Sequence, residues 1–412
     1  IGSTVQSITL TNGNIGMKSM DSGFQNPATM FTASTNCQLT FWNGGFNGSL
    51  NLLQGSSVSV YSDPSGWAFN GDTITFGDGV TWLTYGNSGN EPINSAIILN
   101  GIAHIRLGDH NLLFTNVISG PGGFLLEYWN HAMILAAANT YSGPTIINQG
   151  GNSLYVALTN NGSISHSSLI FFGGGDPNSL RMDVSGRDDQ TFTLADGQTL
   201  AGVGAINGKL VVSAGATISP AGTNVTLGIT AGSNPTGTLS ASNDITLNGT
   251  TIMKLNSSGD NDVIQTSGNI QFGGTLTLEN IGSTPLAAGD SFQLFNAAGY
   301  SGAFSSTNLP ALNSGLAWDL SALNTGLVKV VATGGNGPLI GGRTVADGNL
   351  IFSGSGGTAN GTYYVLTATN LLTPLADWLP VQTNTFDADG DFNVTNTLDA
   401  NVPQVFYRIE QP

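Results

Sequence analysis

The chain has 412 residues, of which 8% are charged, and its 25 acidic and 9 basic residues give a formal net charge of −16. An ordinary globular protein has about 25% charged residues. Nucleic acids and anionic membranes are bound through clustered Lys and Arg, so this balance argues against both as partners. The 58 glycines, with abundant Ser, Thr and Asn, exclude a mostly helical fold, because these residues are mediocre or poor helix formers.

Short runs of alternating apolar residues recur along the chain, each bounded by Gly, Asn, Asp or Ser, which is typical of strands joined by tight turns. The clearest runs are residues 4–10, 72–86, 101–109, 207–222, 243–256, 268–282 and 325–335. Helical periodicity is nearly absent, so the sequence predicts an all-β fold. No run approaches the ~18 apolar residues that a membrane helix needs, so no membrane insertion is expected.

The spacing of these strands fits two architectures. A sandwich or barrel is one, and a β-solenoid with coils of roughly 20–25 residues is the other. In coils stacked at ~4.8 Å, the backbone N–H and C=O groups of one coil form hydrogen bonds with those of the next. The same short spacing disfavours charged residues of one sign stacked in successive coils. The low charge and the many Asn and Thr residues therefore favour the solenoid. Its inward positions are predicted to hold Val, Ile, Leu and Phe, as represented by Ile206, Leu210, Val212, Ile218, Leu227 and Leu276.

Three short motifs follow one another within residues 111–150. They are Ile118-Ser119-Gly120-Pro121-Gly122-Gly123, Ala138-Asn139-Thr140-Tyr141-Ser142-Gly143 and Thr145-Ile146-Ile147-Asn148-Gln149-Gly150. This order resembles the autotransporter-associated β-strand repeat. Residues 195–222 and 243–312 are similar to later coils of such passengers, in the form found in large secreted proteins of Verrucomicrobia-like and Planctomycetes-like bacteria. Pro144 and the bulky segment 124–134 depart from the pattern. The resemblance implies a right-handed parallel β-helix on a cell surface, with no shared catalytic site.

Changes in composition divide the chain into four regions. We expect an N-terminal β region or cap at 1–75, a β-solenoid at 76–332, a Gly-rich linker at 333–348 and a C-terminal β-sandwich module at 349–412. Residues 20–70 are rich in Phe and Trp and match the repeat poorly. This indicates a cap that covers the open end of the solenoid. The last region resembles the small C-terminal module of the same secreted proteins, with Trp378 and Phe406 in its core and Arg408 at its edge.

No arrangement of residues predicts catalysis. The four histidines, His104, His110, His131 and His166, show no metal-ligand spacing, and no serine lies in a G-x-S-x-G motif. Arg187-Asp188-Asp189 reads as a solvated turn, with the Asp/Arg site of a polysaccharide lyase as the alternative. Cys37 is the only cysteine, so no intrachain disulfide is possible and a buried, inert thiol is expected. We therefore predict no catalytic residues, no organic cofactor and no enzyme activity.

Two acidic clusters are candidates for a metal. Asp387, Asp389 and Asp391 alternate as a hard cation such as Ca²⁺ prefers, but the segment lacks the Glu of an EF-hand loop. The Asp-Gly pair between two strand-like runs favours a plain hairpin turn, with Ca²⁺ as the alternative. Asp260-Asn261-Asp262 is predicted to be a turn of the solenoid, again with Ca²⁺ as the alternative.

Three classes of function follow, in order of preference. The first is an exported structural protein, a self-assembling subunit of an extracellular fibre or bacterial surface layer. The second is a surface adhesin or glycan-binding stalk, and the third is a β-helix enzyme acting on polysaccharides. The chain begins with Ile1 and not with Met. We therefore expect a mature chain whose export signal has been removed. The expected partners are other copies of the chain, joined head to tail by addition of the extended, uncharged N-terminal segment to a neighbour's sheet.

Overall fold

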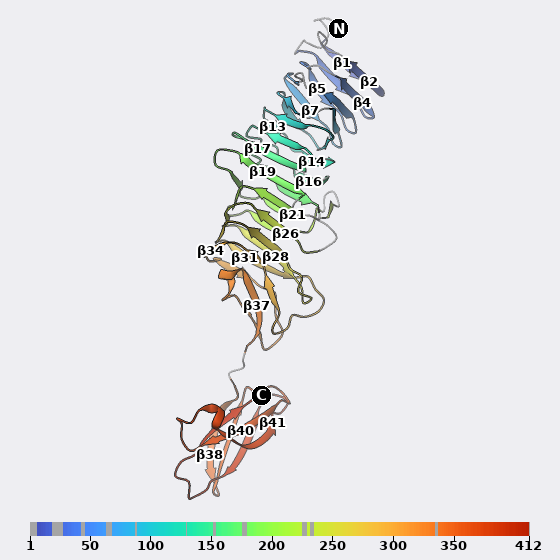
Figure 1. Ribbon diagram of the computed structural model, residues 1–412. Coiled ribbons are helices and arrows are strands. Elements are labelled where there is room, and N and C mark those ends of the chain that lie inside the picture. The colour runs from blue at the N-terminus through green and yellow to red at the C-terminus, as the bar shows by residue number, and fades with distance from the viewer. Residues whose placement is uncertain are drawn as a thin grey trace. The chain divides into compact units, whose positions relative to one another are not determined.

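The computed structural model describes residues 6–18, 28–42, 46–62, 68–86, 89–128, 130–150, 154–174, 179–224, 229–230, 235–333 and 337–411. The chain divides into two compact units, residues 1–312 with 318–330, and residues 313–317 with 331–412. In the first unit, strands lie across a common axis, one coil after the next (Figure 1). Each coil contributes up to three short strands, and each strand pairs in parallel with its counterparts in the neighbouring coils.

The strands of the first unit form three faces. The first face holds two separate sheets. The earlier sheet contains β1 (Ser7–Leu10), β3 (Met30–Ala33), β5 (Ser49–Leu52), β7 (Thr73–Phe76), β10 (Ala96–Leu99) and β13 (Ile118–Ser119), and the later sheet contains β20 (Thr191–Leu194), β22 (Lys209–Val212), β27 (Ile245–Leu247), β30 (Asn269–Phe272) and β34 (Gly299–Gly302). The second face contains β2 (Gly13–Lys18), β4 (Cys37–Trp42), β6 (Ser57–Ser62), β8 (Thr81–Gly86), β11 (Ile102–Leu107), β14 (Gly123–Tyr128), β16 (Thr145–Gly150), β18 (Leu169–Gly173), the first part of β21 (Thr199–Asn207), β23 (Thr217–Pro220), β28 (Thr250–Leu255), β31 (Thr275–Asn280) and β35 (Ser306–Asn308). The third face contains β9 (Asn90–Ile93), β12 (Asn111–Phe114), β15 (Ala132–Leu135), β17 (Leu154–Thr159), β19 (Leu180–Gly186), the second part of β21, β26 (Thr238–Ala241), β29 (Val263–Thr266) and β33 (Phe295–Asn296).

These parallel ladders confirm the predicted all-β fold and β-solenoid. Alternation along each strand sends every second side chain into the interior, as the sequence pattern predicts. The predicted inward positions Ile206, Leu210, Val212, Ile218 and Leu276 are all buried. Leu227 lies outside the described residues.

The N-terminal region joins the same ladders. Leu50 pairs with Ile74, and Ile74 pairs with Ile97, so the first face runs through residue 75 without a break. The described part of residues 1–75, expected as a separate β region or cap, therefore continues the solenoid. Its aromatic residues serve both sides of the sheet. The ring centroids of Phe41 and Phe69 pack 5.3 Å apart in the interior, and Trp42, Tyr61 and Tyr85 form an exterior stack across three coils.

A second apolar cluster lies on the exterior of the second face. Leu125, Ile146, Phe171, Val203 and Ala221 form it, and Ile229 packs against it from the antiparallel pair β24 (Thr223–Asn224) and β25 (Ile229–Thr230). The bulky segment 124–134, which departs from the repeat pattern, supplies Leu125 to this cluster. Ile102, Leu169 and Ala201 also pack against this outward cluster.

The solenoid ends earlier than residue 332. The last parallel strand is β35, and the chain then forms β36 (Leu316–Asp319), the 3-10 turn η1 (Leu323–Thr325) and β37 (Leu327–Ala332). β37 pairs antiparallel with β32 (Ser291–Gln293), so a small antiparallel sheet replaces the coils here. Within the described ranges, both helical elements are single 3-10 turns, and no helix has the length and apolar character needed to cross a membrane.

The second unit is the small sandwich expected at the C-terminus. One sheet has the order β38 (Leu339–Ala346), β39 (Asn349–Ser355), β42 (Phe392–Thr397), and the other has the order β41 (Leu379–Thr385), β40 (Thr362–Ala368), β43 (Phe406–Glu410). Both sheets contribute to one buried core of Phe352, Tyr363, Val365, Phe386, Phe392, Val394 and Ile409. Trp378, which follows the 3-10 turn η2 (Leu375–Asp377), is buried in a second cluster against which Phe406 packs. Residues 339–346, which the Gly-rich composition assigned to a linker, form β38.

Candidate functional site

The acidic segment 387–391 forms a tight turn that connects β41 to β42. One carboxylate oxygen of Asp387, Oδ1, accepts hydrogen bonds from the backbone N–H groups of Asp389 at 3.0 Å and Asp391 at 2.8 Å. Gly390 takes a φ of 80°, a conformation that glycine adopts at little cost. β41 and β42 belong to different sheets, so this turn joins the two layers of the sandwich and is not the ladder hairpin that we expected.

The predicted Ca²⁺ ligands do not all share one environment. Asp387 and Asp391 line a groove of about 780 Å³ at one end of the sandwich, whereas Asp389 does not line it. Within the described ranges, no group of three or more His, Cys, Asp or Glu side chains is placed to hold a metal ion. Ca²⁺ binding at this turn stays a prediction.

Residues far apart in the sequence complete this C-terminal groove. Its lining consists of Gly341 and Gly342 of β38, Ser353, Gly354 and Ser355 of β39, Tyr363 of β40, Asn384 and Thr385 of β41, Asp387 and Asp391 of the turn, and Phe392 and Asn393 of β42. Tyr363 is 2% exposed, and Asn384 also lines the groove. Burial raises the pKa of this phenol, so it is protonated at neutral pH and available for hydrogen bonding.

Two glycines shape the groove in different ways. Gly354 lies against the Leu339 carbonyl and the Phe392 ring, where a Cβ atom would clash with both. Gly341 is the extra residue at a register shift between β38 and β39, and a Cβ there would meet nothing within 4 Å. β-Bulges and strand glycines often mark places where a ligand approaches the backbone. The Gly341-Gly342 pair is the sequence signal for this groove, although its composition is typical of a linker.

The histidines form two separate contacts with glutamates. His110 Nε2 lies 2.6 Å from Glu91 Oε2 inside the solenoid, where both residues are buried. Burial raises the pKa of the Glu91 carboxyl, although its contact with His110 acts in the opposite direction. On the exterior of the second face, Glu127 lies 3.6 Å from His104 and accepts a hydrogen bond of 3.1 Å from Arg106. The contact with His104 and the hydrogen bond and charge of Arg106 lower the pKa of Glu127. Neither contact assembles a nucleophile and a base.

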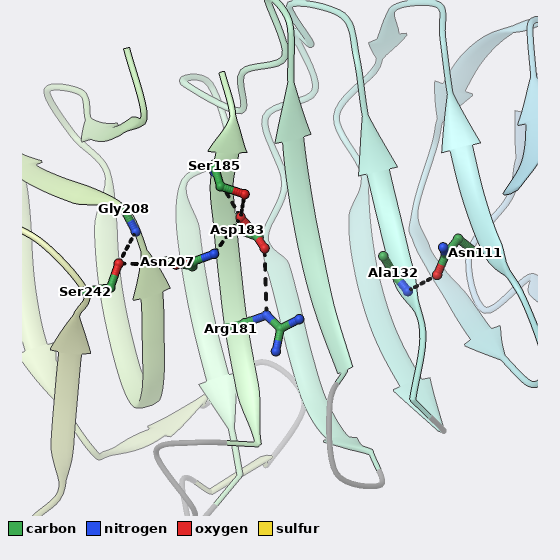
Figure 2. Close-up of polar contacts among 8 residues, drawn as sticks. All are labelled: Asn111, Ala132, Arg181, Asp183, Ser185, Asn207, Gly208 and Ser242. Carbon is green, nitrogen blue, oxygen red and sulfur yellow. Dashed lines mark hydrogen bonds and ion pairs between the residues drawn. The ribbon is translucent and has the colours of Figure 1, made fainter. Parts of the chain in front are cut away.

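A row of polar side chains crosses the exterior of the third face (Figure 2). Asp183 Oδ1 accepts hydrogen bonds from the backbone N–H and hydroxyl of Ser185 and, at 3.0 Å, from Asn207 Nδ2. Asn207 Oδ1 in turn accepts a hydrogen bond from the Ser242 hydroxyl at 3.2 Å. Arg181 lies over the Tyr155 ring at 4.1 Å and has only a loose 3.9 Å contact with Asp183.

This row connects neighbouring coils. Burial alone would raise the pKa of Asp183, but the hydrogen bonds from Ser185 and Asn207 and the charge of Arg181 lower it. The carboxylate is therefore ionised at neutral pH and tied to the next coil through Asn207. A similar bond, 2.8 Å from the Ala132 N–H to Asn111 Oδ1, joins β12 to β15 in Figure 2. The geometry fits stabilisation of the stack.

The other singled-out residues have local partners. Asp262 is buried, and its carboxylate contacts Lys254 Nζ at 2.7 Å and accepts hydrogen bonds from the N–H groups of Lys254 and Gly237. Arg187 Nε donates a hydrogen bond of 3.0 Å to Asp189 Oδ1 within one turn, and Arg187 also bonds to the Gly162 carbonyl of a neighbouring coil. Cys37 is a free, buried thiol, as predicted.

No protein-family model matches the chain, and no curated protein matches it. The resemblance to the autotransporter-associated repeat therefore rests on the quoted motifs.

Proposed function

We propose that the chain is an exported structural protein whose copies join end to end in an extracellular fibre or surface layer. The observation that carries this proposal is a pair of open strand edges. Among the described residues, β1 pairs only with β3, and β38 pairs only with β39. Open edges present unpaired N–H and C=O groups, which are templates for another strand.

The acceptor edge in this proposal is β38. All eight of its residues are exposed, including the apolar side chains Leu339, Ile340 and Val345 at 60%, 42% and 65%. Proteins commonly protect an edge strand with charge, proline or a covering segment. β38 carries one charged residue, Arg343, and no proline. Its exposed apolar side chains support the idea that a second strand covers it in the assembly.

The donor in this proposal is the N-terminal segment of another copy. β1 has the uncharged sequence Ser-Ile-Thr-Leu, and Ile8 and Leu10 are only partly buried in the solenoid. Its backbone groups and apolar side chains suit strand addition to an open sheet edge. Donor and acceptor are different surfaces, so the contact is heterologous, and repetition gives an open filament unless the rotation closes a ring.

Negative-stain imaging and sedimentation of three variants test this function. Deletion of residues 1–12 removes the donor, and Val345→Lys places a charge on the acceptor strand. Both should give folded chains that no longer polymerise. The matched control is Leu372→Lys, which changes an apolar residue of the same module that is 89% exposed and lies outside the strands. Filaments from the truncated chain, formed as readily as from the intact one, would refute strand donation.

A further inference from the structure

We propose that the C-terminal groove is a binding site for a neutral saccharide. This inference does not depend on the proposed assembly, because the groove lies within one module of one copy. It rests on the shape of the groove, on the chemistry of its lining and on the glycine at its wall.

The groove has the size and construction of a ligand site. Its volume of about 780 Å³ lies within the ~300–1,000 Å³ typical of small-molecule sites. Strands of both sheets and the 387–391 turn supply its lining, so the sandwich core holds its walls in place. Tyr363 and Phe392 are members of that core and also line the groove.

The lining offers hydrogen-bond donors and acceptors in close alternation. Asn384 and Asn393 each carry an amide with both functions, and Thr385 adds a hydroxyl. Asp387 and Asp391 add carboxylate acceptors. Asp387 uses Oδ1 to hold the turn, and its other carboxylate oxygen has no hydrogen bond within the described part of the chain. Such a mixture matches sugar hydroxyl groups, which donate and accept together.

The charge of the lining determines the kind of saccharide. Two carboxylates line the groove, and no Lys, Arg or His residue does. Phosphorylated, sulfated and uronic-acid ligands would therefore be repelled without a compensating cation. A neutral, hydroxyl-rich ligand avoids this repulsion and uses the carboxylates as strong acceptors.

Gly341 lines the groove and has no side chain that could fill it. The fold does not demand glycine there, because a Cβ would meet nothing within 4 Å and the backbone does not take a left-handed conformation. A side chain at this position would instead occupy free space at the wall of the groove. We therefore expect Gly341→Phe to fill part of the groove, with no clash at its Cβ atom.

The test uses the full chain and a panel of neutral oligosaccharides from glucan, mannan, xylan and N-acetylated chitin, with oligogalacturonate as the anionic control. Binding is followed by isothermal titration calorimetry and saturation-transfer NMR. At least one neutral oligosaccharide should bind and oligogalacturonate should not. Gly341→Phe should abolish this binding. Asp391→Ala and Asn393→Ala should each weaken it by roughly tenfold, the loss expected for one good hydrogen bond.

Asp389→Ala is the matched control, because Asp389 belongs to the same turn but does not line the groove. It should bind like the unmodified chain, with or without EDTA. Asp391→Ala and Asn393→Ala leave β38 unchanged, so a loss of binding with normal filaments separates the groove from the assembly edge. The proposal is overturned if no neutral saccharide of the panel binds, if Gly341→Phe binds normally, or if binding requires Ca²⁺.

Discussion

Asn139 Oδ1 accepts a hydrogen bond of 2.9 Å from the backbone N–H of Ile118, one coil earlier in the solenoid. The amide nitrogen of the same side chain donates to the carbonyl oxygens of Ala137 and, one coil later, Ser163. Asn139 is 2% exposed, so one buried side chain ties three successive coils together. This gives a physical reason for asparagine in the Ala138–Gly143 motif.

Asn139→Ala should lower the free energy of unfolding by about 2–3 kcal/mol, because it leaves the buried N–H of Ile118 without its partner. It also removes one hydrogen bond each from the Ala137 and Ser163 carbonyls, which keep their backbone partners. Urea denaturation followed by circular dichroism measures this loss. Asn161→Ala, at an exposed position in the following turn, should change stability by less than ~0.5 kcal/mol. Equal effects of the two substitutions would show that the hydrogen bonds of Asn139 contribute nothing specific.

Val212→Asp should destabilise the solenoid by on the order of 3–5 kcal/mol, because it buries a carboxylate without a partner. Val212 is fully buried on β22. Its neighbour Val211 points to the other side of the strand and is only partly buried, so Val211→Asp should cost much less. Thermal unfolding of both variants decides the matter, and unchanged unfolding of Val212→Asp would disprove the inward assignment.

Glu91→Gln should make stability less dependent on pH. Burial raises the pKa of Glu91 above its ordinary value of 4.5, so between the unfolded and folded pKa values the folded chain binds more protons than the unfolded chain. The contribution of this carboxyl is therefore complete below the unfolded pKa and is lost as the pH rises through the folded pKa. The stability of Glu91→Gln relative to the unmodified chain should accordingly increase from pH 4 toward neutrality.

Urea denaturation at a series of pH values measures this difference. Glu279→Gln is the control, because Glu279 is exposed on β31 and its replacement should add no such trend. A constant difference between Glu91→Gln and the unmodified chain across the pH series would contradict the role assigned to burial.

EDTA should shift the melting temperature little, because backbone hydrogen bonds to Asp387 hold the 387–391 turn. Asp387→Ala should lower stability by about 1 kcal/mol through loss of these bonds, and Asp389→Ala should have little effect. Differential scanning calorimetry with and without EDTA checks both statements. A large drop caused by EDTA and abolished by Asp389→Ala would instead make Ca²⁺ a structural ligand.

Alternation of apolar residues was sufficient to predict the strands and the inward positions described by the structure, because burial in a strand has a period of two. The choice of a solenoid over a sandwich or barrel depended instead on the low charge and the many Asn and Thr residues. Alternation alone did not predict features that depend on which residues of neighbouring strands lie side by side. From the sequence, Trp42 and Tyr61 are interpreted as residues of a cap. In the structure their rings stack on each other from neighbouring coils, which explains why these aromatic side chains lie on the outside of the solenoid. β38 was missed because its Gly341-Gly342 pair resembles a linker.

The C-terminal groove was only partly predictable. The spacing of Asp387 and Asp391 singled out two of its lining residues. Nothing local in the sequence connects them to Tyr363 or Asn384, because these residues meet only when the two sheets of the sandwich face each other. A group of residues that come from separate strands can be predicted only when the order of the strands in the two sheets is known.

Arg106 and Glu127 occupy the same register position in neighbouring coils, with Arg106 Nε 3.1 Å from Glu127 Oε2. A coil copied by gene duplication would place every outward residue over its own duplicate, at the ~4.8 Å spacing of paired strands. Thr over Thr or Asn over Asn costs nothing, but an arginine over its duplicate is repelled until one copy mutates. Because charged residues are scarce, whole coils can be added to a solenoid with little repulsion between stacked like charges.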